Sequence, residues 1–200
     1  MKKYLILIVG PPATGKTYLI DQITNILERS IVITPDEFKI DMAESVGFNN
    51  LNEKQKLEVK VWEYYYSALA LYMGVGKRFI LSEYPFSDKQ KGLLKELAEK
   101  NDYIPITIRL VADFETLWER RRERDIEESR HLSLIMNKYH YGDTLVNRSE
   151  ADALITKEEF RQIISDRKYN EFQLGEIFEF DVTDFTKVDF NELFRYLEKL

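Results

Sequence analysis

The sequence predicts an α/β protein whose mostly parallel, five-stranded sheet carries helices on both faces. Residues 4–9 form a continuous apolar run, which is typical of a strand buried on both faces of a sheet. Segments of strand length then alternate with segments of helical periodicity, the order from which parallel sheets are built. We expect the 200 residues to form a single domain around one core.

The first half of the chain is expected to supply three strands and three helices. Apolar side chains recur every three or four residues in two stretches, which predicts amphipathic helices there. Pro35 ends the second strand, and the acidic residues that follow it favour the start of another helix. In the long helix, Tyr64, Tyr65 and Tyr66 are consecutive and cannot all face the core. The expected strands are residues 4–9, 31–34 and 79–81, and the expected helices are residues 15–29, a helix that starts at about 36, and residues 51–73.

The second half is expected to continue the alternation up to one irregular region. Asp113 is the expected N-cap of a helix that carries a dense run of arginines. Residues 131–152 have weak periodicity and many polar side chains, which predicts a lid or an irregular insertion at about 120–156. The remaining expected elements are the helices 88–100 and 190–200 and the strands 104–111 and 177–180.

Composition excludes several classes of protein. The chain has no cysteine, which excludes disulfide frameworks, thiolate metal clusters and cysteine nucleophiles, and suits the reducing cytoplasm. Two histidines are too few for a zinc site. With 29 basic and 35 acidic residues the net charge is −6, which disfavours indiscriminate binding to nucleic-acid backbones. The first apolar run is too short to span a bilayer, so we expect no membrane partner and a cytoplasmic protein.

Residues 10–17, GPPATGKT, match the phosphate-binding loop pattern G-x-x-x-x-G-K-[ST] and connect the first strand directly to a helix. In that context backbone N–H groups and the helix dipole converge on phosphates. The ammonium of Lys16 is expected to contact the terminal phosphates of ATP, and the hydroxyl of Thr17 a Mg²⁺ ion. The motif predicts the fold of P-loop NTPases, with nucleotide bound by Gly10, Ala13, Thr14, Gly15, Lys16 and Thr17.

Two carboxylates follow strands that end at the same edge of the sheet. Asp36 follows the second strand, where it is a candidate general base or, alternatively, only a helix cap. Glu83 follows the third strand, where it is a candidate for orienting Mg²⁺ or binding substrate, or is simply solvated.

The arginine run at residues 120–124, with Arg130 behind it, is the richest cationic cluster in the chain. These arginines either belong to a lid that stabilises the charge of a transferred phosphoryl group, or lie on a surface helix and form ion pairs with neighbouring acidic residues. Arg120 and Arg124 lie one turn apart and share a face, and Arg130 can approach after the chain bends. Arg121 and Arg122 are expected to point elsewhere unless the helix ends early.

Motifs that would indicate a GTPase are missing. Residues 137–140, NKYH, lack the carboxylate of the guanine-reading N-K-x-D motif, and no D-x-x-G occurs. Small kinases therefore remain the main class.

The order GPPATGKT, TPDEF, ILSE, RRRERD, Arg130-His131 and FDVTDF resembles the P-loop kinases grouped with polynucleotide 5′-kinase, zeta toxin and related small-molecule phosphotransferases. The resemblance implies that Asp36 accepts the proton of the substrate hydroxyl and that Arg120, Arg124 and Arg130 contact phosphates. It also places Thr183 near the adenine. Where some members of that group continue as R-H-P-G-H, this chain has Leu132-Ser133-Leu134 after His131.

These observations predict a kinase that uses ATP and Mg²⁺ to phosphorylate a hydroxyl group. The favoured acceptor is a small molecule such as a nucleoside, a sugar or an antibiotic, and a nucleic-acid 5′ end is a second possibility. The alternative to a kinase is a nucleotide-binding switch or slow ATPase without an acceptor.

Overall fold

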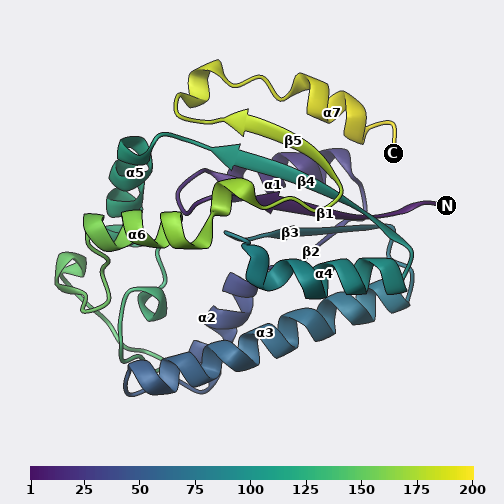
Figure 1. Ribbon diagram of the computed structural model, residues 1–200. Coiled ribbons are helices and arrows are strands. Elements are labelled where there is room, and N and C mark those ends of the chain that lie inside the picture. The colour runs from purple at the N-terminus through teal and green to yellow at the C-terminus, as the bar shows by residue number, and fades with distance from the viewer.

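The computed structural model describes all 200 residues and contains one five-stranded sheet of order β2-β3-β1-β4-β5. Every neighbouring pair of strands is parallel, which confirms the predicted class (Figure 1). The strands are β1 (Lys3–Val9), β2 (Ile31–Val32), β3 (Phe79–Glu83), β4 (Tyr103–Val111) and β5 (Glu176–Asp181). The helices are α1 (Lys16–Ile26), α2 (Pro35–Ser45), α3 (Leu51–Gly74), α4 (Asp88–Lys100), α5 (Phe114–Ile126), α6 (Lys157–Arg167) and α7 (Asn191–Leu197).

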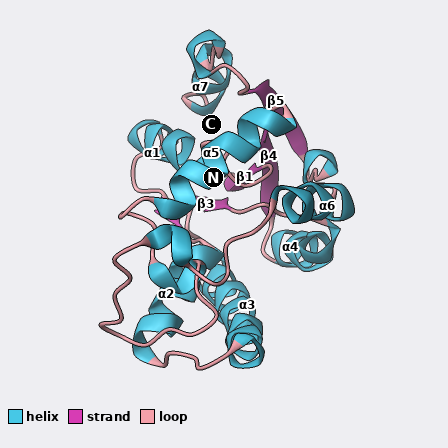
Figure 2. Ribbon diagram, turned by 90° about the vertical axis from the view of Figure 1, so that its left-hand side faces the viewer, coloured by secondary structure: helices cyan, strands magenta, loops and turns pink.

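Two apolar layers hold the helices on opposite faces of the sheet, because successive residues of β1 point in opposite directions. Tyr4, Ile6 and Ile8 face the layer that contains α1 and α7. Leu5 and Leu7 face the layer that contains α3 and α4. Figures 1 and 2 show these helices on the two sides of the sheet. None of the helices combines the length and the apolar character needed to cross a membrane.

The three consecutive tyrosines of α3 separate as expected from their spacing. Tyr65 is fully buried and its hydroxyl shares a 2.8 Å hydrogen bond with Ser82 of β3, whereas Tyr64 is 54% exposed. Tyr66 is half-buried and packs against Trp62.

The helix α6 is an element that the sequence interpretation did not include. Thr156 caps it by accepting from the backbone N–H of Glu159, and the Glu159 side chain accepts in return from the N–H of Thr156. This reciprocal capping was present in the sequence as T-x-x-E. Phe160 is buried against Phe114 and Trp118, so α6 packs on α5.

The insertion, residues 131–156, has only two short 3₁₀ turns, in agreement with its weak periodicity. It nevertheless has a small core of its own, in which Leu132, Ile135 and Tyr139 pack against Ala43 and Phe48. A backbone bridge between Phe48 and Tyr139 closes this contact. The insertion is therefore attached to α2 and to the turn that follows it.

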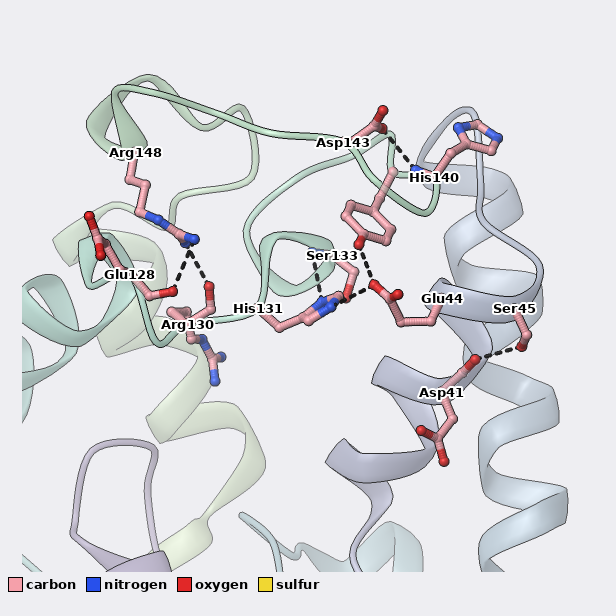
Figure 3. Close-up of polar contacts among 11 residues, drawn as sticks. Asp41, Glu44, Ser45, Glu128, Arg130, His131, Ser133, His140, Asp143 and Arg148 are labelled. Carbon is pink, nitrogen blue, oxygen red and sulfur yellow. Dashed lines mark hydrogen bonds and ion pairs between the residues drawn. The ribbon is translucent and has the colours of Figure 1, made fainter.

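Polar contacts strengthen the attachment of the insertion. Figure 3 shows the imidazole of His131 pointing at the carboxylate of Glu44 on α2. The hydroxyl of Tyr139 donates to the same carboxylate. The His131 Nε2–Glu44 Oε1 distance is 2.8 Å. Arg148 donates to the carbonyls of Arg130 and Glu128, which ties the far part of the insertion to the end of α5.

Candidate active site

The phosphate-binding loop lies between the end of β1 and the start of α1, at the carboxyl edge of the sheet. Gly10 is required there because a Cβ atom would lie 2.1 Å from the carbonyl oxygen of Leu110 on β4, and its φ is +132°. Thr14 is buried and its hydroxyl donates to the carbonyl of Pro11 at 3.0 Å. These contacts fix a turn that brings the loop directly onto the N-terminus of α1.

The ammonium of Lys16 folds back over this loop. Its Nζ donates to the carbonyls of Gly10 and Pro11 at 3.1 and 2.9 Å. Burial lowers the pKa of Lys16 to about 8, with Arg124 acting in the same direction and the charges of Glu83 and Asp36 opposing it. No carboxylate lies within ion-pair distance of this ammonium, so its charge is available to an anion.

Thr17 and Glu83 form a polar pair beside the loop. The Thr17 hydroxyl donates to Glu83 Oε1 at 2.8 Å. Burial raises the pKa of Glu83, although the Thr17 hydrogen bond and the Lys16 charge act against that shift. Two oxygen donors next to a phosphate loop fit Mg²⁺, which is commonly held by one or two protein ligands together with phosphate oxygens and waters. No cluster of three or more acidic or histidine side chains that could hold a metal ion exists in the chain.

Asp36 is in the first turn of α2 but does not cap that helix. The cap is Thr34, whose hydroxyl accepts from the backbone N–H of Glu37 at 3.3 Å. The carboxylate of Asp36 is 48% exposed and its ion-pair partner is Lys39, at 2.8 Å. The capping alternative therefore has no hydrogen bond to support it.

Lys39 holds Asp36 in its ionised form. Burial disfavours the charge of Asp36, but Lys39, Arg130 and Lys16 more than offset it, so that the pKa of Asp36 is lowered. The same ammonium donates to the hydroxyl of Tyr84 at 3.0 Å and lies 4.6 Å from the centre of its ring. The sequence interpretation did not single out Lys39, although its i,i+3 spacing from Asp36 on a helix indicates such a pair.

Three arginines converge on the buried carboxylate of Asp125, which is 6% exposed. Arg121 Nε lies 3.0 Å from it, a terminal nitrogen of Arg124 3.2 Å, and Arg130 Nε 3.5 Å. One carboxylate cannot neutralise three guanidinium groups. Burial lowers the pKa of Arg130 to about 10, and the neighbouring charge of Arg124 acts in the same direction. The Nε atoms of Arg124 and Arg130 are buried without a hydrogen-bond partner.

Arg121 is not turned away from the site, contrary to the expectation from helical spacing. It lines the same cavity as Arg120, Arg124 and Arg130, whereas Arg122 is exposed to solvent as expected. The buried Asp125 accounts for the difference, because it draws the Arg121 side chain inward along the helix.

Arg120 and Thr183 make hydrogen bonds to backbone groups and do not take part in the arginine cluster around Asp125. The guanidinium of Arg120 donates to the carbonyls of Val182 and Thr183 at 2.8 and 3.0 Å and lies 4.8 Å from the centre of the Phe185 ring. The Thr183 hydroxyl accepts from the backbone N–H of Asp113. Phe185 lies against Gly15, where a Cβ atom would meet the ring at 2.4 Å. Arg120 thus joins α5 to the segment after β5 beside the loop.

A cavity of about 730 Å³ brings most of these groups together, within the range usual for small-molecule sites. Its lining includes Ala13, Gly15, Lys16 and Thr17 of the loop, Asp36 and Glu83, and the four arginines 120, 121, 124 and 130. Gly10 and Thr14 lie beneath the loop surface and Thr183 lies outside the cavity. Lys39, Lys54, Tyr84 and Arg167 also line it and were not singled out from the sequence.

Solved structures share this fold, while no family model and no curated protein sequence matches the chain. A predicted kinase from Chloroflexus aurantiacus J-10-fl is 23% identical, with a TM-score of 0.76, and the match covers 100% of this chain and 98% of that one. The tunicamycin resistance protein of Deinococcus radiodurans is 16% identical, with a TM-score of 0.54, over 99% and 95% of the two chains. A chain of the Pnkp1/Rnl/Hen1 RNA repair complex is 11% identical, with a TM-score of 0.58, over 87% of this chain and 47% of that chain. The chain therefore has the fold of P-loop kinases, which confirms the resemblance inferred from the sequence at the level of architecture.

Proposed function

We propose that this protein is a kinase that uses ATP and Mg²⁺ to transfer the γ-phosphoryl group to a hydroxyl of a small molecule. The observation that carries the proposal is the cavity in which the phosphate-binding loop and the ionised carboxylate of Asp36 share one lining. A nucleotide switch needs the loop and elements that order around the γ-phosphate, whereas a kinase also needs a carboxylate that faces the acceptor hydroxyl. The fold shared with a predicted kinase supports the same class.

In this proposal the loop and the arginines bind the nucleotide. The backbone N–H groups around residues 13–17 and the ammonium of Lys16 bind the phosphates. Thr17 and Glu83 are the residues that would hold Mg²⁺, which would supply charge neutralisation for the phosphates. Arg124 and Arg130 stabilise the transferring group, since their charge exceeds what Asp125 neutralises. Arg120, Phe185 and Thr183 form the end of the site at which the base of the nucleotide binds.

Asp36 orients the acceptor hydroxyl and receives its proton. The acceptor oxygen forms a bond to the γ-phosphorus, the bond from phosphorus to the bridging oxygen of ATP breaks, and the acceptor proton moves to the Asp36 carboxylate. The lowered pKa of Asp36 keeps it ionised at neutral pH, although it also makes the carboxylate a weak base. Positioning of the hydroxyl is therefore a substantial part of its role.

A screen for phosphoryl acceptors tests the proposal. Parent protein and Lys16→Ala are incubated with Mg²⁺, γ-labelled ATP and a library of nucleosides, sugars, hydroxy acids and antibiotics, with a 5′-hydroxyl oligonucleotide as a separate arm. We expect the parent protein to label at least one small compound and Lys16→Ala to label none. Release of label only as inorganic phosphate, with every compound, would instead identify an ATPase or a switch.

The absence of cysteine suits the reducing cytoplasm, where we propose that the kinase acts.

A further inference from the structure

The part of the cavity away from the phosphate-binding loop, which we term the acceptor half, is mainly apolar. Its walls come from α2, from the turn after it, from the N-terminal half of α3 and from the insertion. The apolar side chains in these walls are Met42, Ala43, Phe48, Leu57, Val61, Leu134 and Ile155. Such a lining favours an acceptor with an apolar body over a highly hydrated sugar.

One cation, Lys54, lies in this apolar lining. It comes from the first turn of α3, and its Nζ donates to the backbone carbonyl of Met136 in the insertion at 2.8 Å. The ammonium lies 5.3 Å from the centre of the Phe48 ring. No carboxylate lies within 4.0 Å of it, although Glu58 is one helical turn away on the same face.

Nearby carboxylates compensate the charge of Lys54 only in part, because none of them forms an ion pair with it. Burial lowers the pKa of Lys54, the charges of Lys39 and Arg130 act in the same direction, and the carboxylates of Glu58 and Asp152 oppose them. Lys39 has Asp36 as its partner and Arg130 has Asp125, whereas Lys54 has only a neutral carbonyl. A half-buried ammonium in this state gains most from an anionic ligand.

The excess of positive charge in the whole cavity also favours an anionic ligand. Its lining contains eight lysine or arginine side chains and three acidic ones. The phosphates of a nucleotide account for Lys16 and for the four lining arginines between residues 120 and 130, and Lys39 is paired with Asp36. Lys54 on α3 and Arg167 on α6 belong to other walls. Glu58 lies one helical turn from Lys54 on α3, but it is not in ion-pair contact with Lys54, so an anionic occupant of the acceptor half would supply a direct partner for the ammonium.

We propose that the acceptor is a small molecule with an apolar body and an anionic group, and that Lys54 binds this anionic group. The inference rests on the proposed kinase function and specifies its substrate class. Lys54 is a specificity-determining residue of the acceptor half, while Asp36 contacts the hydroxyl to be phosphorylated. A neutral nucleoside or sugar leaves the Lys54 charge without a partner and is disfavoured.

Two fluorescent dyes with nearly the same apolar body test this proposal through binding. 8-Anilinonaphthalene-1-sulfonate carries an anionic group and N-phenyl-1-naphthylamine does not. Each is titrated into the parent protein, Lys54→Gln and Lys56→Gln, with Mg²⁺ and a non-hydrolysable ATP analogue present to fill the phosphate side. Glutamine removes the charge and keeps an N–H donor on a slightly shorter side chain, and Lys56 is an exposed lysine of the same helix.

We expect Lys54→Gln to weaken binding of the anionic dye about tenfold or more, the usual worth of a charge-assisted contact, and to leave the neutral dye within about twofold. Lys56→Gln should change neither dissociation constant. Equal affinity of the parent and Lys54→Gln for the anionic dye would overturn the proposal. So would an equal loss for both dyes, because that would indicate a change of cavity shape.

These outcomes are separable from failure of the kinase assignment. If the affinity for the anionic dye depends on Lys54 but no compound in the acceptor screen is phosphorylated, the anion site is supported and the kinase function is contradicted. If neutral alcohols are phosphorylated equally well by the parent and Lys54→Gln, the kinase function stands and the anionic acceptor does not.

Discussion

The phosphate side and the acceptor half of the cavity are built from the chain in different ways. The phosphate side of the cavity is centred on one continuous stretch, residues 10–17, to which β3 adds Glu83 and the segment 120–130 adds four arginines. The acceptor half is assembled over long distances, as in the contacts Lys54–Met136 and Glu44–His131, which join residues 82 and 87 positions apart. The phosphate-binding loop is thus encoded locally, whereas selection of an acceptor depends on how α2, α3 and the insertion pack.

The difference extends to charge. On the phosphate side, unneutralised cations cluster around Lys16 and Asp125 and match a polyanion. In the acceptor half Lys54 lies among apolar side chains without an ion-pair partner, and Glu58 lies one helical turn away. Substitutions on the phosphate side should therefore affect every substrate, and substitutions in the acceptor half should affect some substrates and leave the nucleotide alone.

The largest effect on the phosphate side is expected from Arg124. Arg124→Ala should lower the rate of phosphoryl transfer by about 10³-fold, because a guanidinium that stabilises the transferring group is lost. Arg122→Ala, an exposed arginine of the same helix, should leave the rate unchanged. Rates are measured in single turnover with an acceptor from the screen. Similar small effects of both substitutions would show that Arg124 only pairs with Asp125.

Lys16→Ala should weaken ATP binding by roughly 10- to 150-fold, the range expected when a charged hydrogen bond to phosphate is removed. Calorimetry with Mg²⁺ and a non-hydrolysable ATP analogue measures the change. The anionic dye, bound in the acceptor half, should keep its affinity in this variant. Unchanged nucleotide affinity would contradict the assignment of the loop.

The lowered pKa of Lys16 predicts a pH dependence of nucleotide binding. With a pKa of about 8, the Lys16 side chain is mostly a charged ammonium below pH 8 and mostly a neutral amine above it. Phosphates favour the charged form and are fully ionised in this range, so ATP affinity should be constant up to about pH 8 and then fall by up to about tenfold per pH unit. Lys16→Ala serves as the control and should show a flat profile between pH 8 and 9.

The smallest effect is expected at the attachment of the insertion. Glu44→Gln weakens the contacts with His131 and Tyr139 and should make proteases cut residues 131–156 roughly two- to tenfold faster. Asp41→Asn, at an exposed position of the same helix, is the matched control. Nucleotide affinity should be the same in both variants. A drop in nucleotide affinity in Glu44→Gln would show that the two sides of the cavity are not independent.

The sequence allowed the sheet and the phosphate loop to be predicted because both depend on local patterns. The apolar run of β1, the motif at residues 10–17 and the cap at Asp113 each lie within a few neighbouring residues. Two features escaped prediction because they depend on packing. Asp125 turns Arg121 inward, and the insertion carries Met136 to Lys54. The helix α6 was within reach, since its capping residues Thr156 and Glu159 are visible in the sequence.

Single-turnover phosphoryl transfer by Asp36→Asn tests the central claim most directly, namely that one cavity joins the phosphate loop to an acceptor-binding carboxylate. Asparagine keeps the shape of the side chain but cannot take up the proton, and Asp41→Asn is the control on the same helix. At saturating ATP, transfer to the acceptor should fall by roughly 10² to 10⁴ in Asp36→Asn, with ATP affinity and folding retained. Transfer within a few fold of the parent would contradict the account and would leave Asp36 as only the ion-pair partner of Lys39.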